Sequence, residues 1–71
     1  SKPYRSEITY NFIASCIEGG AEVDYCSCLF DYIVKNMKEA EFLKEETKYL
    51  LQEEFSDEFL EVMSAARLEC N

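Results

Sequence analysis

Apolar residues recur along this chain with a period close to that of an α-helix, which indicates four successive helices. The expected segments are Ser6 to Glu18, about Glu22 to Lys35, Asn36 to near Glu53, and Ser56 to the C-terminal end. Proline occurs once and glycine twice in 71 residues. Since these two residue types are the strongest helix breakers, the chain is predicted to be nearly all helical.

Local signals define the expected helix ends. Ser6, Asn36 and Ser56 are residue types that cap helix N-termini. Asn36 is followed three residues later by Glu39, the spacing of a capping box. Gly19 and Gly20 are expected to stop the first helix, because glycine adopts the left-handed C-terminal conformation without a Cβ penalty.

The apolar positions also predict which helix faces are buried. In the first helix they are Ile8, Phe12, Ile13, Cys16 and Ile17. In the third they are Ala40, Leu43, Thr47, Leu50 and Leu51, flanked by Phe42 and Tyr49. In the fourth they are Phe59, Met63, Ala66 and Cys70. The second helix has two adjacent apolar stripes, so we expect it to be covered on several sides and to be the central element. Among the tyrosines, Tyr10 is the best candidate for an exposed aromatic.

Four cysteines, at positions 16, 26, 28 and 70, lie on these apolar faces. An even number in so short a chain is typical of disulfides, which small domains need because their cores are marginal. Cys26 and Cys28 cannot bond to each other, since residues two apart in a helix point about 200° apart. Two pairings remain open: Cys16–Cys26 with Cys28–Cys70, or Cys16–Cys28 with Cys26–Cys70. The register of the first helical hairpin favours the former.

Two other uses of the cysteines fit the pattern less well. Zinc sites usually present their ligands in pairs with C-x2–4-C spacing, whereas the close pair here is Cys26-Ser27-Cys28 and Cys70 stands alone. A reactive thiolate needs basic surroundings, whereas three acids lie close in the sequence: Glu18, Glu22 and Asp24. A small thiol-redox or metal-handling protein that uses the Cys26-Ser27-Cys28 segment is therefore the alternative functional hypothesis.

Either pairing joins Cys70, at the end of the fourth helix, to the start of the second helix. The two Cα atoms must then lie within roughly 7 Å. In a regular up-and-down bundle these helix ends would be about 20 Å apart. We therefore predict an all-α fold for residues 1–71, a single domain: a small irregular four-helix bundle with two disulfides. The fourth helix runs antiparallel to the second, and the third crosses obliquely.

The charge of the chain excludes several function classes. Fifteen acidic and seven basic residues give a net charge of −8, and there is no histidine. Binding to nucleic acids or to anionic membrane surfaces needs clustered Lys and Arg, which do not fit a net charge of −8. The chain also lacks the run of about 20 apolar residues that a membrane span needs. Without histidine the commonest general base and metal ligand are missing. We predict no enzyme activity, no cofactor and no metal, and a basic protein is the favoured partner class.

Acidic residues are concentrated in the segment EEFSDEFLE, residues 53–61. Acids on exposed helix faces are ordinarily only solvated, so their number alone does not define a site. This segment, however, is expected at the end of the molecule without a crosslink, which should be its more mobile part. We therefore predict a protein-binding site at four residues: Glu53, Glu54, Asp57 and Glu58.

The order of several motifs resembles small four-cysteine helical domains of secreted or lipid-anchored bacterial proteins. The shared features are an F-x3-C motif, a glycine turn, a Y-C-x-C motif, an E-F helix start and a final cysteine. They correspond to Phe12, Cys16, Gly19, Gly20, Tyr25, Cys26, Cys28, Glu41, Phe42 and Cys70. The resemblance implies an exported, disulfide-bonded, non-catalytic domain of uncharacterised function.

Together these features predict a secreted or periplasmic non-catalytic protein-interaction module that acts through its acidic surface. Disulfides form and persist in oxidising compartments, so the expected location is secreted, periplasmic or extracellular. No signal-peptide pattern is present, and the start SKPYRSE is typical of a mature or excised segment. The sequence leaves open the identity of the partner, the oligomeric state and the existence of an upstream signal or lipid anchor.

Overall fold

The computed structural model describes residues 3–71, and this part of the chain forms four α-helices. They are α1 (Ser6–Glu18), α2 (Val23–Asn36), α3 (Glu39–Gln52) and α4 (Asp57–Glu69). Each predicted helix is present, and its ends lie within three residues of the expected ones. The all-α prediction is therefore confirmed.

Two of the predicted helix-end signals operate as expected. The Ser56 hydroxyl accepts a hydrogen bond from the Phe59 backbone N–H at 3.1 Å, which caps α4. The glycine pair follows α1, and Gly20 has a φ of 105°, a conformation that other residues rarely adopt. At the start of α1, by contrast, the N-cap residue is Arg5 and Ser6 is already helical.

The predicted start of the third helix is wrong by two residues. Asn36 belongs to the last turn of α2, where its side-chain amide donates to the Tyr32 carbonyl at 2.8 Å. The backbone is extended at Met37, and Lys38 is the N-cap residue of α3. Glu41, rather than Glu39, folds back to accept the Lys38 N–H at 2.8 Å.

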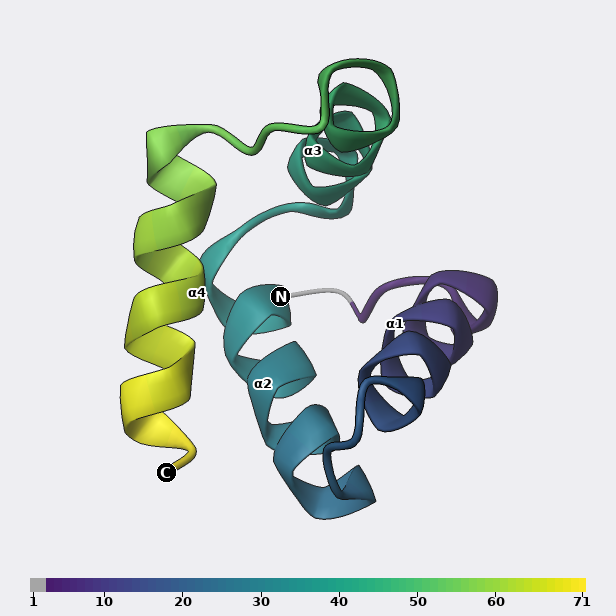
Figure 1. Ribbon diagram of the computed structural model, residues 1–71, viewed down its shortest axis with the longest axis vertical. Helices are drawn as coiled ribbons and strands as arrows, with labels where there is room; N and C mark the ends of the chain where they lie inside the picture. Colours follow the sequence, from purple (N-terminus) through teal and green to yellow (C-terminus); the bar gives the residue numbers. More distant parts are fainter. Residues whose placement is uncertain (1–2) are drawn as a thin grey trace.

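Helix α2 is the central element, as predicted. Its closest backbone neighbours are α1 on one side and α4 on the other (Figure 1). Helix α4 runs antiparallel beside α2, so the C-terminal end of the chain lies next to the start of α2. Helix α3 crosses the far end of this pair and is seen nearly along its axis in Figure 1. The irregular bundle with an oblique third helix is confirmed.

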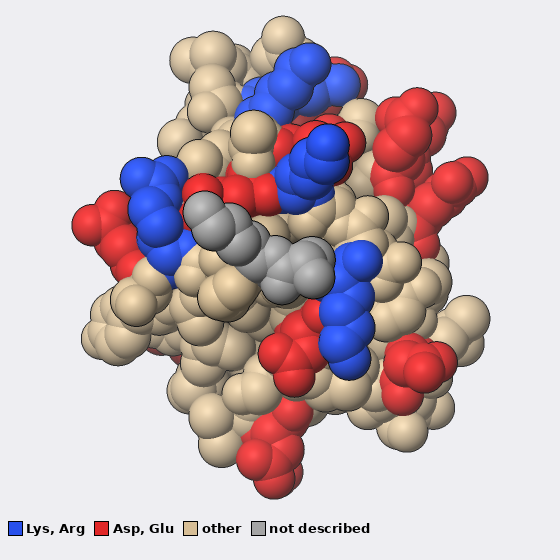
Figure 2. Space-filling model, turned by 180° about the vertical axis from the view of Figure 1, so that it is seen from behind, with Lys and Arg blue, Asp and Glu red and all other residues tan. Residues whose placement is uncertain are grey.

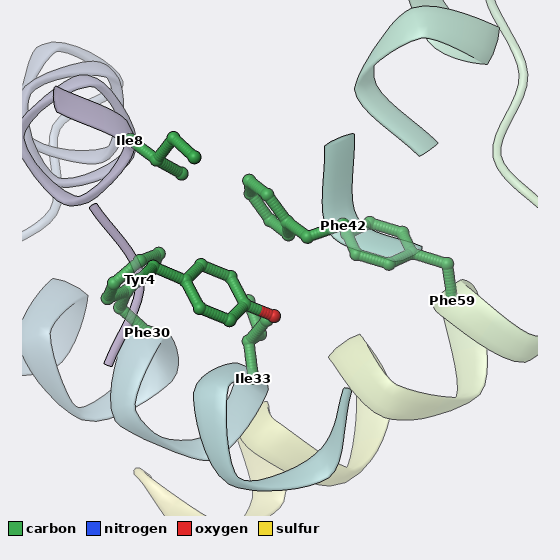
Figure 3. Packing of buried hydrophobic residues seen from close by; sticks show 6 residues of the cluster. All are labelled: Tyr4, Ile8, Phe30, Ile33, Phe42 and Phe59. Atoms are coloured by element: carbon green, nitrogen blue, oxygen red, sulfur yellow. The ribbon is translucent and has the colours of Figure 1, made fainter. Parts of the chain in front are cut away.

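The core is built largely from aromatic rings. Its buried members are Tyr4, Ile8, Phe30, Ile33, Phe42 and Phe59 (Figure 3). Phe42 of α3 lies within 6.2 Å, centroid to centroid, of the rings of Phe12, Phe30 and Phe59. It is also 5.5 Å from the ring of Tyr4. This single side chain of α3 therefore contacts rings from every other part of the fold.

Tyr4, which precedes α1, is a core residue that the periodicity analysis missed because it lies outside the helices. Its ring packs edge-on against Phe30 at 5.4 Å, and its hydroxyl donates to the Met37 carbonyl at 2.7 Å. Burial, with smaller effects from Glu41 and Glu39, raises the pKa of Tyr4 to about 12. The hydroxyl therefore remains a hydrogen-bond donor, which joins the N-terminal segment to the α2–α3 connection.

The predicted buried faces are correct for α4 but only partly correct for α3, where Leu43 packs against the core. Phe59 and Ala66 of α4 are buried as expected. In α3, Phe42 is 2% exposed, whereas Leu50 and Leu51 are 81% and 79% exposed. Because each residue turns a helix by about 100°, Leu51 lies opposite the inward-facing Phe42. Leu50 lies only about 80° from Phe42 around the helix, but it belongs to the last turn of α3. Ile17 of α1, also predicted to be buried, is 44% exposed.

Candidate protein-binding surface

The cysteines form two disulfides, Cys16–Cys26 and Cys28–Cys70, with Cα separations of 5.9 and 5.8 Å. This is the pairing that hairpin register favours. The first bond joins α1 to α2, and the second joins the start of α2 to the residue that follows α4. Both bonds therefore lie at the same end of α2, and none of the described cysteines is free.

The Cys26-Ser27-Cys28 segment does not bring two thiols together. Cys26 is completely buried and bonds toward α1, whereas Cys28 bonds toward the C-terminal end of α4. Within residues 3–71, no cluster of three or more His, Cys, Asp or Glu side chains is arranged to hold a metal ion.

The four predicted binding residues are all exposed and lie at the α3–α4 turn, away from the disulfides. Glu53 and Glu54 follow α3, while Asp57 and Glu58 form the first turn of α4. None of these carboxylates forms an ion pair with any of the described residues 3–71. Glu58 lines the same hollow as Lys44 and Lys48, yet it too makes no ion pair with them.

Glu53 has an unusual backbone conformation, with a φ of 56° and a ψ of 33°. In this left-handed region glycine is favoured over residues that carry a Cβ atom. The conformation ends α3 and turns the chain toward α4. It also directs two consecutive carboxylates, Glu53 and Glu54, into solvent at the turn.

A hydrogen-bonded contact holds this turn in place, although it has no covalent crosslink. Glu45 of α3 accepts from the Ser56 N–H at 2.9 Å and from the Ser56 hydroxyl at 2.6 Å. The Tyr49 and Phe55 rings stack nearby, with centroids 4.6 Å apart. Sequence reasoning missed the Glu45–Ser56 contact, because the two residues lie 11 positions apart on different elements.

The Ser56 hydrogen bonds lower the pKa of Glu45, since they favour its ionised form. A carboxyl group whose pKa is lower in the folded state stabilises the fold above its unfolded pKa, which is about 4.5 here. That stabilisation is lost as the pH falls through the folded-state pKa. We expect Glu45→Gln to lower the free energy of unfolding at pH 7 by about 1 kcal/mol. The difference in free energy of unfolding between the wild type and Glu45→Gln should become smaller as the pH approaches 3.

Glu46→Gln is the matched control, because burial raises the pKa of Glu46 and its charge therefore opposes folding. This substitution should leave the stability at pH 7 unchanged or increase it. Urea unfolding at pH 7 and pH 3 measures both effects. Equal losses for Glu45→Gln and Glu46→Gln would contradict a specific role for the Glu45–Ser56 contact.

Basic side chains gather around the α2–α3 connection, and two of them, Lys44 and Lys48, lie in the hollow that Glu58 also lines. Five of the six described Lys and Arg residues line two adjoining hollows at the α2–α3 connection: Arg5, Lys35, Lys38, Lys44 and Lys48. Figure 2 shows several Lys and Arg side chains on the rear face, with carboxylates between them. Eleven of the fifteen acids lie outside these hollows. Lys35 also lines a hollow with three of these eleven acids, Asp24, Asp31 and Glu69.

Comparison of the chain with protein-family models, with curated proteins and with solved structures finds no match. In the part of the chain that the structure describes, no helix has the length and apolar character needed to cross a bilayer. The two disulfides are compatible with an oxidising compartment.

Proposed function

We propose that this chain is a secreted or periplasmic, non-catalytic interaction module that binds a basic protein through its acidic surface. The observation that carries the proposal is the set of exposed carboxylates at the α3–α4 turn: Glu53, Glu54, Asp57 and Glu58. They are solvent-accessible and have no basic partner among residues 3–71. Clustered, unpaired charge of one sign attracts and orients a partner of the opposite sign.

The rest of the molecule supports a binding role in an oxidising compartment. The two disulfides hold α1, α2 and α4 together at one end. The Glu45–Ser56 hydrogen bonds fix the acidic turn at the other end. A surface that is already ordered loses less conformational entropy when it binds. A thiol-redox function would instead require two thiols that can approach each other, and Cys26 and Cys28 bond to different partners.

We expect the double variant Glu54→Lys and Asp57→Lys to weaken binding to the native basic partner about tenfold near 0.15 M salt. The partner is first isolated on the immobilised protein from its native compartment, and the dissociation constants are then measured with purified components. Since the attraction is between exposed charges, the difference between wild type and variant should shrink as the salt concentration rises.

The matched control is Asp31→Lys with Glu69→Lys, which makes the same change in net charge on exposed residues away from the α3–α4 turn. This variant should bind nearly as well as the wild type. If both double variants lose the same affinity, net charge rather than the acidic turn governs binding. If neither loses affinity, the proposed site is wrong.

A further inference from the structure

The outer face of α1 has an apolar groove that nothing else in the described chain covers. Tyr10, Ile13, Ala14 and Ile17 line a hollow of about 370 Å³, with Glu18 at its margin. Tyr10 is 72% exposed and Ile17 is 44% exposed. Ile8 and Phe12, on the inward side of the same helix, pack into the core, and the partly buried Ile13 contacts it as well. Helix α1 is therefore apolar on two sides, of which the protein itself covers one.

The groove is held on a rigid support. Cys16, adjacent in sequence to Ile17, is bonded to the fully buried Cys26 of α2. Phe12 packs against Phe30 with ring centroids 5.1 Å apart. Because α1 is fixed by a covalent bond and by core packing, the groove is already formed before any partner arrives. A preformed apolar groove on a helix is suited to receive the apolar face of another amphipathic helix.

The charge around the groove identifies its occupant. The charged residues of α1 are Glu7 and Glu18, and the helix has no Lys or Arg. Glu7, Tyr10, Ala14 and Ile17 follow a helical stripe, so carboxylates flank the groove near both ends. Glu18 also lies at the negative end of the helix dipole, in a last turn without a basic residue. Both effects favour cations on the partner beside the groove.

A second copy of this chain fits the groove poorly. An antiparallel pairing of two α1 helices about Ala14 would set Glu7 of one copy within about one helical turn of Glu18 of the other along the axis, and each copy carries a charge of −8. An anionic membrane surface would be repelled by the same carboxylates.

We propose that the α1 groove binds a basic amphipathic helix of another protein. Its apolar side chains pack against Tyr10 and Ile17, and its Lys or Arg residues lie beside Glu7 and Glu18. This site is separate from the acidic α3–α4 turn and does not depend on the function proposed for that turn.

The test uses a fluorescently labelled synthetic peptide with leucines at i, i+3, i+4 and i+7 and lysines elsewhere. The matched probe has glutamate in place of every lysine. Fluorescence anisotropy gives the dissociation constant, and backbone amide NMR shifts locate the bound peptide. We expect the lysine peptide to bind with its largest shifts in residues 7–18, and the glutamate peptide to bind at least tenfold more weakly.

Substitutions then separate the groove from other exposed apolar residues. The double variant Tyr10→Ser with Ile17→Ser should bind the lysine peptide at least tenfold more weakly than the wild type. Tyr10→Phe should retain the affinity for this peptide. Leu68→Ser is the control, since Leu68 is 81% exposed on α4 and away from α1; it should change affinity less than threefold. Circular dichroism and melting temperatures verify that every variant remains folded.

Several results would overturn this inference. Largest shifts at residues 53–58, with binding lost in the Glu54→Lys and Asp57→Lys variant, would place the peptide at the acidic turn; the function proposed for that turn would then stand without the groove. Equal binding of the glutamate peptide would exclude the charge argument. Sedimentation that shows a dimer, dissociated by Ile17→Ser, would identify a second copy as the occupant. Equal NMR shifts in α1 with anionic lipid vesicles alone would indicate a membrane surface.

Discussion

Replacing Cys28 and Cys70 together with alanine is expected to lower the free energy of unfolding by about 4 kcal/mol. The bond between them spans 42 positions of sequence, so it removes much of the loop-closure entropy of the unfolded chain. A domain of this size has only about 5–10 kcal/mol of stability, which makes this a loss of roughly half. The C-terminal end of α4 should also lose its anchor and fray first.

Urea unfolding of the double variant, with Cys16–Cys26 intact, measures this loss in the free energy of unfolding. Titration of free thiols verifies which bond is missing. Ser27→Ala is the control, because Ser27 is exposed on the same turn of α2 and should change stability by less than 0.5 kcal/mol. In wild-type protein, excess reductant also removes the Cys16–Cys26 bond, which contributes about a further 2.7 kcal/mol. An unchanged melting temperature in reductant would show that neither bond stabilises the fold.

Much of the backbone architecture could be predicted from the sequence, because its determinants are local or covalent. Helical periodicity identified the helices, Ser56 marked the start of α4 and the glycine pair marked the end of α1. The requirement that Cys70 reach the start of α2 then excluded a regular bundle. These inferences succeeded because each depends on neighbouring residues or on the fixed length of a disulfide.

The buried face of α3 could not be predicted in the same way. This helix has apolar residues on two faces, and counting them favoured the face with Leu50 and Leu51. The crossing angle of α3 instead directs Phe42 into a ring cluster supplied by Tyr4, Phe12, Phe30 and Phe59. That choice depends on contacts between distant segments, and helical periodicity does not contain them.

In the candidate site, too, local features could be predicted from the sequence and contacts between distant segments could not. The four carboxylates were visible as a run of acids, and their exposure follows from their place at a helix–helix turn. The Glu45–Ser56 hydrogen bonds and the outward position of Ile17 depend on how α3 and α1 pack against the rest of the fold. No spacing rule relates Glu45 to Ser56, since the chain leaves α3 and changes direction before α4 begins.

Phe42→Ala is expected to lower the free energy of unfolding by about 3–5 kcal/mol, the usual range for a buried phenylalanine. Phe42 contacts four other rings, so its removal leaves a cavity that the surrounding rigid aromatic side chains fill poorly. The close backbone packing of the fold joins α1 to α2 and α2 to α4. Because α3 is attached mainly through side chains, it should be the first helix to separate from the rest.

Leu50→Ala on the same helix is the matched control for Phe42→Ala. Both substitutions shorten a large apolar side chain of α3 to alanine, but Leu50 is 81% exposed where Phe42 is 2% exposed. Leu50→Ala should change stability by less than 0.5 kcal/mol, since it removes no core contact. Urea unfolding compares the two variants, and amide hydrogen exchange shows whether α3 opens before α2 in Phe42→Ala. Similar losses for both variants would mean that the face of α3 bearing Leu50 is buried in solution, which would contradict the orientation of this helix.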